Sequence, residues 1–388
     1  MTTNTLTNLI PDLYAALDVV SRELVGMIPA VTVDASVNRA AVNENVRVPI
    51  APANTAGGDI TPAMSIPAEA DQTIGYSTIA ITKARAFPFS WNGEEQRGLN
   101  NGPGYLGIRA NQIAQAMRAA VNEVETDLCA LHAVMSRAAG TAGTTPFATT
   151  TAGLTSARKI LADNGAPLSE AQLVLDTTAG ASLRTLLNIN STRDESRLPI
   201  SSQGVITRIS DMNIRESGQV VTSTAGTMAS ATTTSAAFTV GQTVLPLATA
   251  GTGVVAAGDI ITLANDTNQY VVTSVSFAGA NPASGDSITI AAPGLRKAQG
   301  VATRAITVVA AAARSMAFAR SSIVLATRLP ERPAEGDLAL DVMTITDPRS
   351  GLSFEVAIYG GYRKIRYEIA LAWGVKCIKP EHTALLLG

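Results

Sequence analysis

The chain has 388 residues, of which 46% are apolar, 4% are aromatic and 15% are charged. Its length allows two or three compact units, and its apolar content allows a large buried core. The formal net charge of −2 excludes a strongly basic protein dedicated to nucleic acid or to anionic membranes. The low aromatic and charged contents are unusual for an enzyme of this size.

The two cysteines, Cys129 and Cys377, are far apart in the sequence and lie in apolar surroundings. We expect buried free thiols, which fits a reducing cytoplasm. The first residues lack the basic start and apolar run of a signal peptide, and the apolar run 305–313 is too short to cross a bilayer. These features predict a soluble protein inside the cell.

Residues 10–28 have apolar side chains at helical spacing, among them Leu13 and Leu17, and Pro29 ends the pattern. We interpret this helix and the irregular stretch 29–44 as a terminal arm that docks on another surface. An ordinary packed first helix is the alternative. Leu13 and Leu17 are candidate subunit-interface residues.

Residues 45–91 contain two extended segments, 46–50 and 73–91, joined by a connection rich in Ala, Pro and Gly. Connections of this length without periodicity are uncommon inside compact domains. A lone hairpin has no core of its own in which to bury apolar side chains. We therefore interpret 45–91 as a two-stranded arm that contacts a neighbour, with a disordered surface loop as the alternative. The candidate interface residues of this arm are Ile60, Met64 and Ile66.

Residues 103–140 carry apolar side chains at steps of four and three from Ile113 to Met135. This spacing predicts one amphipathic helix of about 45–50 Å that ends at Gly140. We interpret it as a rod to which other parts are attached, although a long core helix is the plain alternative. His132 and Cys129 on it are expected to be packing residues. Its charged residues are expected to form a solvated face: Arg109, Arg118, Glu123, Glu125 and Asp127.

A mixed α/β block follows, with helices at 153–164 and 178–188 around a buried strand at 172–175. The composition then changes, because from 217 to 295 the only charged residues are three aspartates. Short β-prone segments with turn signals between them indicate a small all-β barrel or sandwich inserted into another domain. The segments are 219–223, 236–240, 243–247, 259–264, 269–276 and 287–291.

The C-terminal part predicts a strand at 323–328, a hairpin at 341–359 and a long strand at 365–377. The last has the clearest alternation in the chain, with Ile365, Ile369 and Trp373 on its apolar face. A strand this long needs a long partner, and the helix at 103–140 is the expected one. The fold class is therefore α+β.

No motif for chemistry is complete. The two histidines, His132 and His382, suggest no metal cluster, and no nucleophile elbow is present. The segment 156–159 matches S-x-x-K without its companion motifs. Gly251, Gly253 and Gly258 imitate a phosphate loop without the following helix, and Asp266 with Asn268 fits an ordinary turn. We predict no catalytic, cofactor-binding or metal residues, no cofactor and no enzyme activity.

The order of these parts resembles the major capsid (coat) proteins of tailed double-stranded-DNA bacteriophages, which have the Hong Kong 97-type capsid fold. At the residue level, 313–319 leading to 323–328 resembles the segment that re-enters the axial domain. Residues 369–375 followed by 379–381 are similar to the C-terminal strand and tail of that family. The β insertion resembles that of short-tailed-phage coat proteins with an insertion domain.

The resemblance implies a structural protein that self-assembles into hexamers and pentamers of an icosahedral shell. It implies a scaffolding protein, a portal protein, packaged dsDNA in weak non-specific contact, with or without a decoration protein, and no membrane. The virion would be assembled in the host bacterial cytoplasm. The implied domains are an N-terminal arm (1–44), an extended hairpin arm (45–91), a peripheral domain with the spine helix (92–149 and 341–388), an axial domain (150–216 and 312–340) and an inserted β-domain (217–311).

One departure concerns the insertion, which lacks a conspicuous charged loop. Whether it stabilises its own subunit or joins neighbouring subunits therefore stays open. The shell of an encapsulin-type compartment is a close alternative, against which the large insertion counts. A β-rich adhesin or tail module belongs to a different class, and an enzyme with an unrecognised site is a remote fourth.

Overall fold

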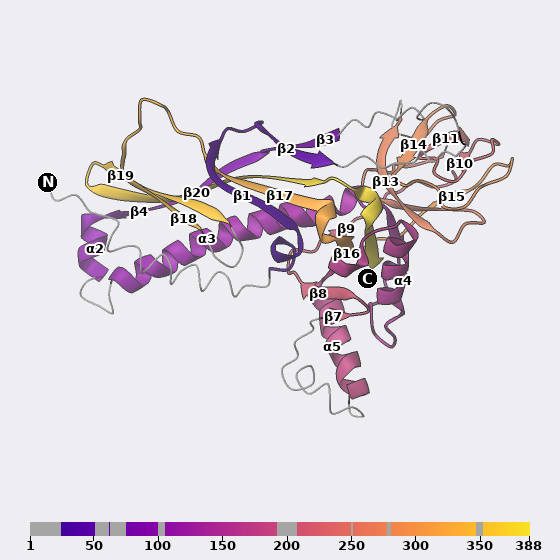
Figure 1. The fold of residues 1–388 in the computed structure, drawn as a ribbon, viewed down its shortest axis with the longest axis horizontal. Coiled ribbons are helices and arrows are strands. Elements are labelled where there is room, and N and C mark those ends of the chain that lie inside the picture. Colours follow the sequence, from indigo (N-terminus) through magenta and orange to yellow (C-terminus); the bar gives the residue numbers. More distant parts are fainter. Residues whose placement is uncertain are drawn as a thin grey trace.

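The computed structural model describes residues 25–50, 62, 75–99, 105–191, 208–249, 251–277, 281–346 and 352–388. Few helices and many strands form the described part of the chain, which confirms the α+β prediction. The molecule is elongated, with one long helix beside a sheet and a β-rich region at one end (Figure 1).

The long helix α3 spans Tyr105–Ala130, which makes it about 39 Å long at 1.5 Å per residue. We call α3 the spine helix. The prediction that it continues to Gly140 is wrong, because a 3₁₀ turn, η3 (Leu131–Val134), and a short strand, β5 (Arg137–Ala139), follow it. Strand β5 pairs with two other strands, so sheet hydrogen bonds override the helical spacing of its apolar residues.

The spine helix lies along a six-stranded sheet whose central strand is β20 (Lys364–Cys377). Strand β4 (Lys83–Asn92) pairs with one edge of β20. On the other edge, β19 (Ser353–Gly361) pairs with the first half of β20 and β17 (Ile323–Pro330) pairs with its end. Strand β18 (Ala339–Thr346) pairs with β19, and β1 (Thr32–Ala40) pairs with β17 in parallel. The expectation that 29–44 is irregular is therefore wrong for most of that stretch.

The predicted packing of the long strand on the long helix is confirmed. Ile369, Leu371 and Trp373 of β20 are fully buried and share one core with Met117 and Leu128 of α3. The indole Nε1 of Trp373 donates a hydrogen bond to Asp127 on the spine helix at 2.8 Å.

A thirteen-stranded sheet forms the second layer, with β16 (Ala312–Ala319) between β6 (Ala171–Leu175) and β21 (Thr383–Leu387). The predicted helices are present as α4 (Ala152–Asp163) and α5 (Thr177–Ser191), and α4 packs against β16 and β21. The remaining strands of this part are β7 (Arg208–Ile209), β8 (Met212–Glu216) and β9 (Thr222–Ser223).

Residues 217–311, which the sequence predicts to be an insertion and which we call the inserted region, build a core of their own from residues such as Phe238, Leu245 and Ile288. Four of the six predicted β-segments are strands over most of their length, 219–223 is a strand only at β9, and 236–240 makes a single bridge through Phe238. The strands are β10 (Thr232–Thr233), β11 (Val244–Thr249), β12 (Ile260–Leu263), β13 (Gln269–Ser276), β14 (Ser287–Ile290) and β15 (Ile306–Val308).

Strands β2 (Asn45–Ile50) and β3 (Gly75–Ala80) pair with each other in a separate sheet, which we call the arm hairpin. The expected single extended run 73–91 is two strands, because β4 leaves the hairpin and joins β20. The short helices outside the two sheets are α2 (Gly93–Leu99), η2 (Ile28–Ala30), η4 (Leu168–Glu170), η6 (Arg320–Ser322) and η7 (Pro380–His382).

Candidate assembly surfaces

The N-terminal segment enters the body beside a buried carboxylate on the spine helix. Glu125 is only 1% exposed, and it accepts hydrogen bonds from the backbone N–H groups of Gly26, Met27 and Ile28 at 2.7, 2.7 and 3.0 Å. Burial raises the pKa of Glu125, while these N–H donors and Ser217 oppose the rise. The prediction that Glu125 belongs to a solvated face is wrong, because this buried carboxylate holds the backbone of residues 26–28 against the spine helix.

The other acidic residues of the spine helix tie it to β4. Lys83 Nζ lies 2.8 Å from Asp127 Oδ1 and 3.2 Å from Glu123 Oε1, and Arg85 Nε lies 3.0 Å from Glu123. The pKa of Lys83 is raised, mainly by its hydrogen bond to Asp127 and against the opposing effect of burial. These partly exposed pairs align helix and strand more than they stabilise the fold.

The arm hairpin is anchored at its base. Ile79 and Ile81 are fully buried against Ala326 and Ala372, and Lys376 Nζ donates to the carbonyl oxygen of Thr78 at 2.8 Å. Above this base the hairpin is largely exposed. Tyr76 is 61% exposed, and the guanidinium carbon of Arg47 lies 4.8 Å from its ring centroid.

The five predicted interface residues lie outside the described residues. Three of them belong to the connection between β2 and β3, and the other two precede the segment that Glu125 holds. The structure therefore describes the roots of both arms. The predicted interface residues themselves stay predictions: Leu13, Leu17, Ile60, Met64 and Ile66.

A second exposed surface runs along β18, the edge strand beside β19. Leu338 and Leu340 are 84% and 63% exposed, although large apolar side chains at a sheet edge usually invite contact with another chain. The loop before β18 is tied to the sheet, since Arg332 donates to Glu355 at 2.8 Å and contacts Asp337. Sequence reasoning missed this surface, because the sequence does not show which strand lies at the edge of a sheet.

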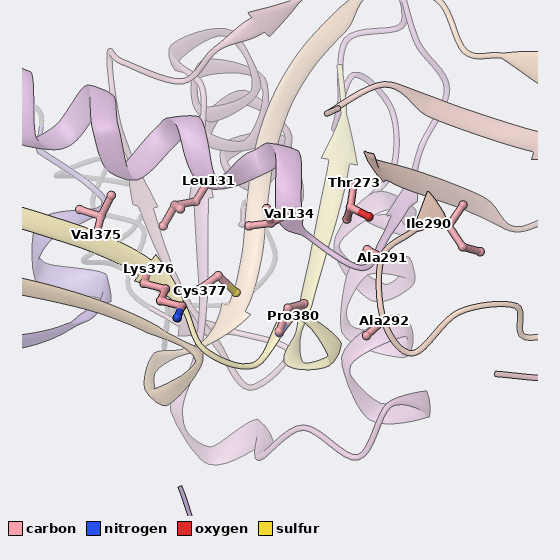
Figure 2. Close-up of a pocket in the computed structure, with 10 residues that line it drawn as sticks. All are labelled: Leu131, Val134, Thr273, Ile290, Ala291, Ala292, Val375, Lys376, Cys377 and Pro380. Carbon is pink, nitrogen blue, oxygen red and sulfur yellow. The ribbon is translucent and has the colours of Figure 1, made fainter. Parts of the chain in front are cut away.

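A cavity of about 330 Å³ lies where the end of the spine helix, β20 and the inserted strands meet (Figure 2). Its wall is mostly apolar, and Lys376 at its side also holds the arm hairpin through Thr78. The lining residues are Leu131, Val134, Thr273, Ile290, Ala291, Ala292, Val375, Lys376, Cys377 and Pro380.

The inserted strands are joined to the body by a shared sheet. Strand β13 pairs with β5, and β5 pairs in parallel with β21. Arg137 on β5 is 3% exposed and donates to Asn268 at 2.9 Å and to Asn164 at 3.3 Å. Backbone pairing and a buried arginine therefore join the strands of 217–311 to the rest of the described chain.

Residues with possible chemistry are explained by packing and turns. Both cysteines are free and buried, as predicted, and burial raises the pKa of each thiol to about 12. Asp266 accepts hydrogen bonds from the backbone N–H of Asn268 and the hydroxyl of Tyr270, as a turn residue does. Among the described residues, no group of three or more His, Cys, Asp or Glu could hold a metal ion.

Within the same described ranges, no helix is long and apolar enough to cross a membrane. No protein-family model matches the chain, and no curated protein matches it. Among solved structures, 97 chains match.

The capsid of cyanophage P-SCSP1u has 11% identity and a TM-score of 0.47, covering 92% of this chain and 86% of that chain. The capsid of a native GTA particle has 11% identity and a TM-score of 0.45, covering 94% and 90%. The virus-like particle of Pyrococcus furiosus has 10% identity and a TM-score of 0.44, covering 98% and 100%. Many of the structural neighbours of this chain are thus phage capsid proteins.

Proposed function

We propose that this chain is a major capsid protein with the Hong Kong 97-type fold, which assembles into the icosahedral shell of a tailed double-stranded-DNA phage. The observation that carries the proposal is the arm hairpin, whose base is locked by Ile79, Ile81 and Lys376 while its outer part is largely exposed among the described residues. A firmly rooted arm of this kind is built to contact a neighbouring copy.

Two further observations support a shell subunit. The spine helix and the six-stranded sheet form a long, stiff plate, and ion pairs from Lys83 and Arg85 hold the two layers in line. The apolar edge at Leu338 and Leu340, beside and in the outer strand β18 of the same sheet, offers a second contact surface. A plate with contact surfaces at several edges can tile a closed surface.

In this proposal the spine helix and the C-terminal strands form the peripheral domain (92–149 and 341–388), and 150–216 with 312–340 form the axial domain around the five-fold and six-fold axes. Residues 1–44 and 45–91 are the two arms, and 217–311 is the inserted domain. The partners are other copies in hexamers and pentamers, a scaffolding protein, a portal protein and packaged DNA. The net charge of −2 suits a wall that holds DNA only weakly.

The test is to produce the chain with and without its scaffolding partner and to inspect the product by electron microscopy and light scattering. We expect closed shells of uniform diameter. A chain that stays monomeric under both conditions contradicts the proposal. Nucleic acid inside native particles supports the phage shell, whereas an enzyme cargo would assign the chain to an encapsulin-type compartment instead.

A further inference from the structure

The end of the spine helix, strand β16 and the inserted region meet around a buried arginine. Arg314 on β16 is 1% exposed, and none of its three guanidinium nitrogens has a hydrogen-bond partner among the described residues. A buried positive charge without hydrogen bonds is costly and sensitive to any further charge nearby. Burial lowers the pKa of Arg314, and the carboxylate of Asp259 in the inserted region opposes this effect.

His132 lies in the same place, on η3 directly after the spine helix. Its Nδ1 is 3.2 Å from the carbonyl oxygen of Cys129, so Nδ1 carries the proton that is donated to that oxygen. The other nitrogen, Nε2, faces the inserted region. A Cβ added to Gly258 would lie 3.4 Å from Nε2, so the ring packs directly against that backbone.

We propose that His132 and Arg314 form an acid-sensitive joint, which loosens the inserted region from the end of the spine helix when His132 gains a second proton. The new proton would sit on Nε2, against the backbone at Gly258 and near the unpartnered guanidinium. The joint belongs to the single subunit, so it does not depend on the proposed shell function.

The charged and titratable groups around His132 come from each element packed against it. Glu125 and Cys129 precede it on the spine helix, Arg314 faces it from β16, and Asp259 follows Gly258 in the inserted region. Asp259 is occupied, because its carboxylate accepts hydrogen bonds from the backbone N–H groups of Gly226 and Ala256 at 3.1 and 2.7 Å. Glu125 is likewise held by residues 26–28.

The direction of the effect follows from linkage. Burial lowers the pKa of His132 below its ordinary 6.5, the Cys129 carbonyl opposes this, and Arg314 lowers it further. The closed joint therefore favours neutral His132. The stabilising contribution of neutral His132 is complete above about pH 6.5. It is lost as the pH falls towards the lower pKa that His132 has in the folded protein. Each pKa unit of this shift changes the equilibrium constant for opening about tenfold.

The test is amide hydrogen exchange of the full chain at about pH 7.5 and about pH 5, expressed as protection relative to the intrinsic rates. We expect a loss of protection in 256–263 and in 312–316 at the lower pH, while the core of the spine helix, 113–124, keeps its protection. Unchanged protection in 256–263 would overturn the proposal.

The chain has only two histidines, which provides a matched control. In His132→Asn the amide can still donate to the Cys129 carbonyl but cannot take up a proton, so the acid step should disappear. His382→Asn removes the other histidine, whose pKa burial also lowers, and should leave the acid step in place. The reverse pattern would refute the joint.

Should His132→Asn fold poorly, the wild-type chain still gives an answer. An NMR titration of chain labelled at histidine has two signals to follow, and the His382→Asn variant assigns them. We expect the His132 signal to titrate below 6.5, its ordinary pKa. A midpoint at or above that value would overturn the proposal.

Discussion

At the scale of single residues, Glu125 shows that spacing along a helix can distinguish a buried carboxylate from exposed ones. It stands four residues after Val121 and four before Cys129, both of which are buried. This position places it inside the apolar stripe of the spine helix, whereas Glu123 and Asp127 flank the stripe. The spacing alone could have separated the buried carboxylate from the solvated ones. Its partners could not be predicted, because they lie about a hundred residues earlier in the chain.

We predict that Glu125→Ala lowers the free energy of unfolding by about 2–4 kcal/mol, because three buried N–H groups lose their acceptor. Chemical denaturation measures the loss. The control is Glu123→Ala on the same helix, whose partly exposed ion pairs with Lys83 and Arg85 should cost about 1 kcal/mol or less. Equal losses in the two variants would contradict the anchoring role of Glu125.

The two thiols allow a second residue-scale prediction. Because burial raises the pKa of Cys129 and of Cys377 to about 12, almost no thiolate exists in the native protein at pH 8. We expect a thiol reagent to label neither cysteine in the native chain and both after denaturation. Rapid native labelling, measured by mass spectrometry, would show that one of them is accessible.

At the scale of elements, the sequence pattern identified strands and helices better than their ends. The alternation in β20 and the spacing in α3 predicted both elements and their contact, since each reflects burial on one face. The end of α3 was misplaced because β5 is buried as a strand by partners distant in sequence. Strand β1 was missed for the same reason, as its pairing partner is β17.

The crossing of the arm hairpin over β20 depends on a glycine. A Cβ at position 374 would collide with the carbonyl oxygen of Ala80. We expect Gly374→Ala to lower the free energy of unfolding by about 1–3 kcal/mol and to expose the arm to limited proteolysis, because the hairpin base must move away. Gly300→Ala is the control, since a Cβ there meets nothing within 4 Å. Unchanged proteolysis of Gly374→Ala would show that the crossing tolerates a side chain.

At the scale of the whole molecule, two sheets meet at the end of the spine helix, and the inserted strands continue the second sheet through β5. The change in composition and the β-prone segments between turn signals predicted most of the strands in 217–295, where the only charged residues are three aspartates. These features could not predict that the strands share a sheet with β21, because pairing between distant segments leaves no local pattern. The exposed edge at β18 could not be predicted for a related reason, because the sequence does not show which strand lies at the edge of a sheet.

The proposed shell makes a prediction about the arms. If Met64 and Ile66 bury apolar surface on a neighbouring copy, the double variant Met64→Ser and Ile66→Ser should lose roughly 1.5–3 kcal/mol of contact per side chain. The subunit concentration needed for assembly should rise by about tenfold or more, with unchanged subunit stability.

Light scattering over a concentration series measures this change. The matched control is Val301→Ser, which removes an apolar side chain that is 77% exposed in the inserted region. Normal assembly of the double variant would exclude these two residues from the interface.

The position of β5 has a consequence for the order of folding. This short strand lies between β13 of the inserted region and β21, so its two edges are completed by segments made much later in synthesis. Pairings over such sequence distances form slowly, because long loops must close first. While the ribosome is still translating, the spine helix therefore ends in an open edge. That edge closes only after residues 383–387 emerge, which is more than 240 residues after β5 itself has been made.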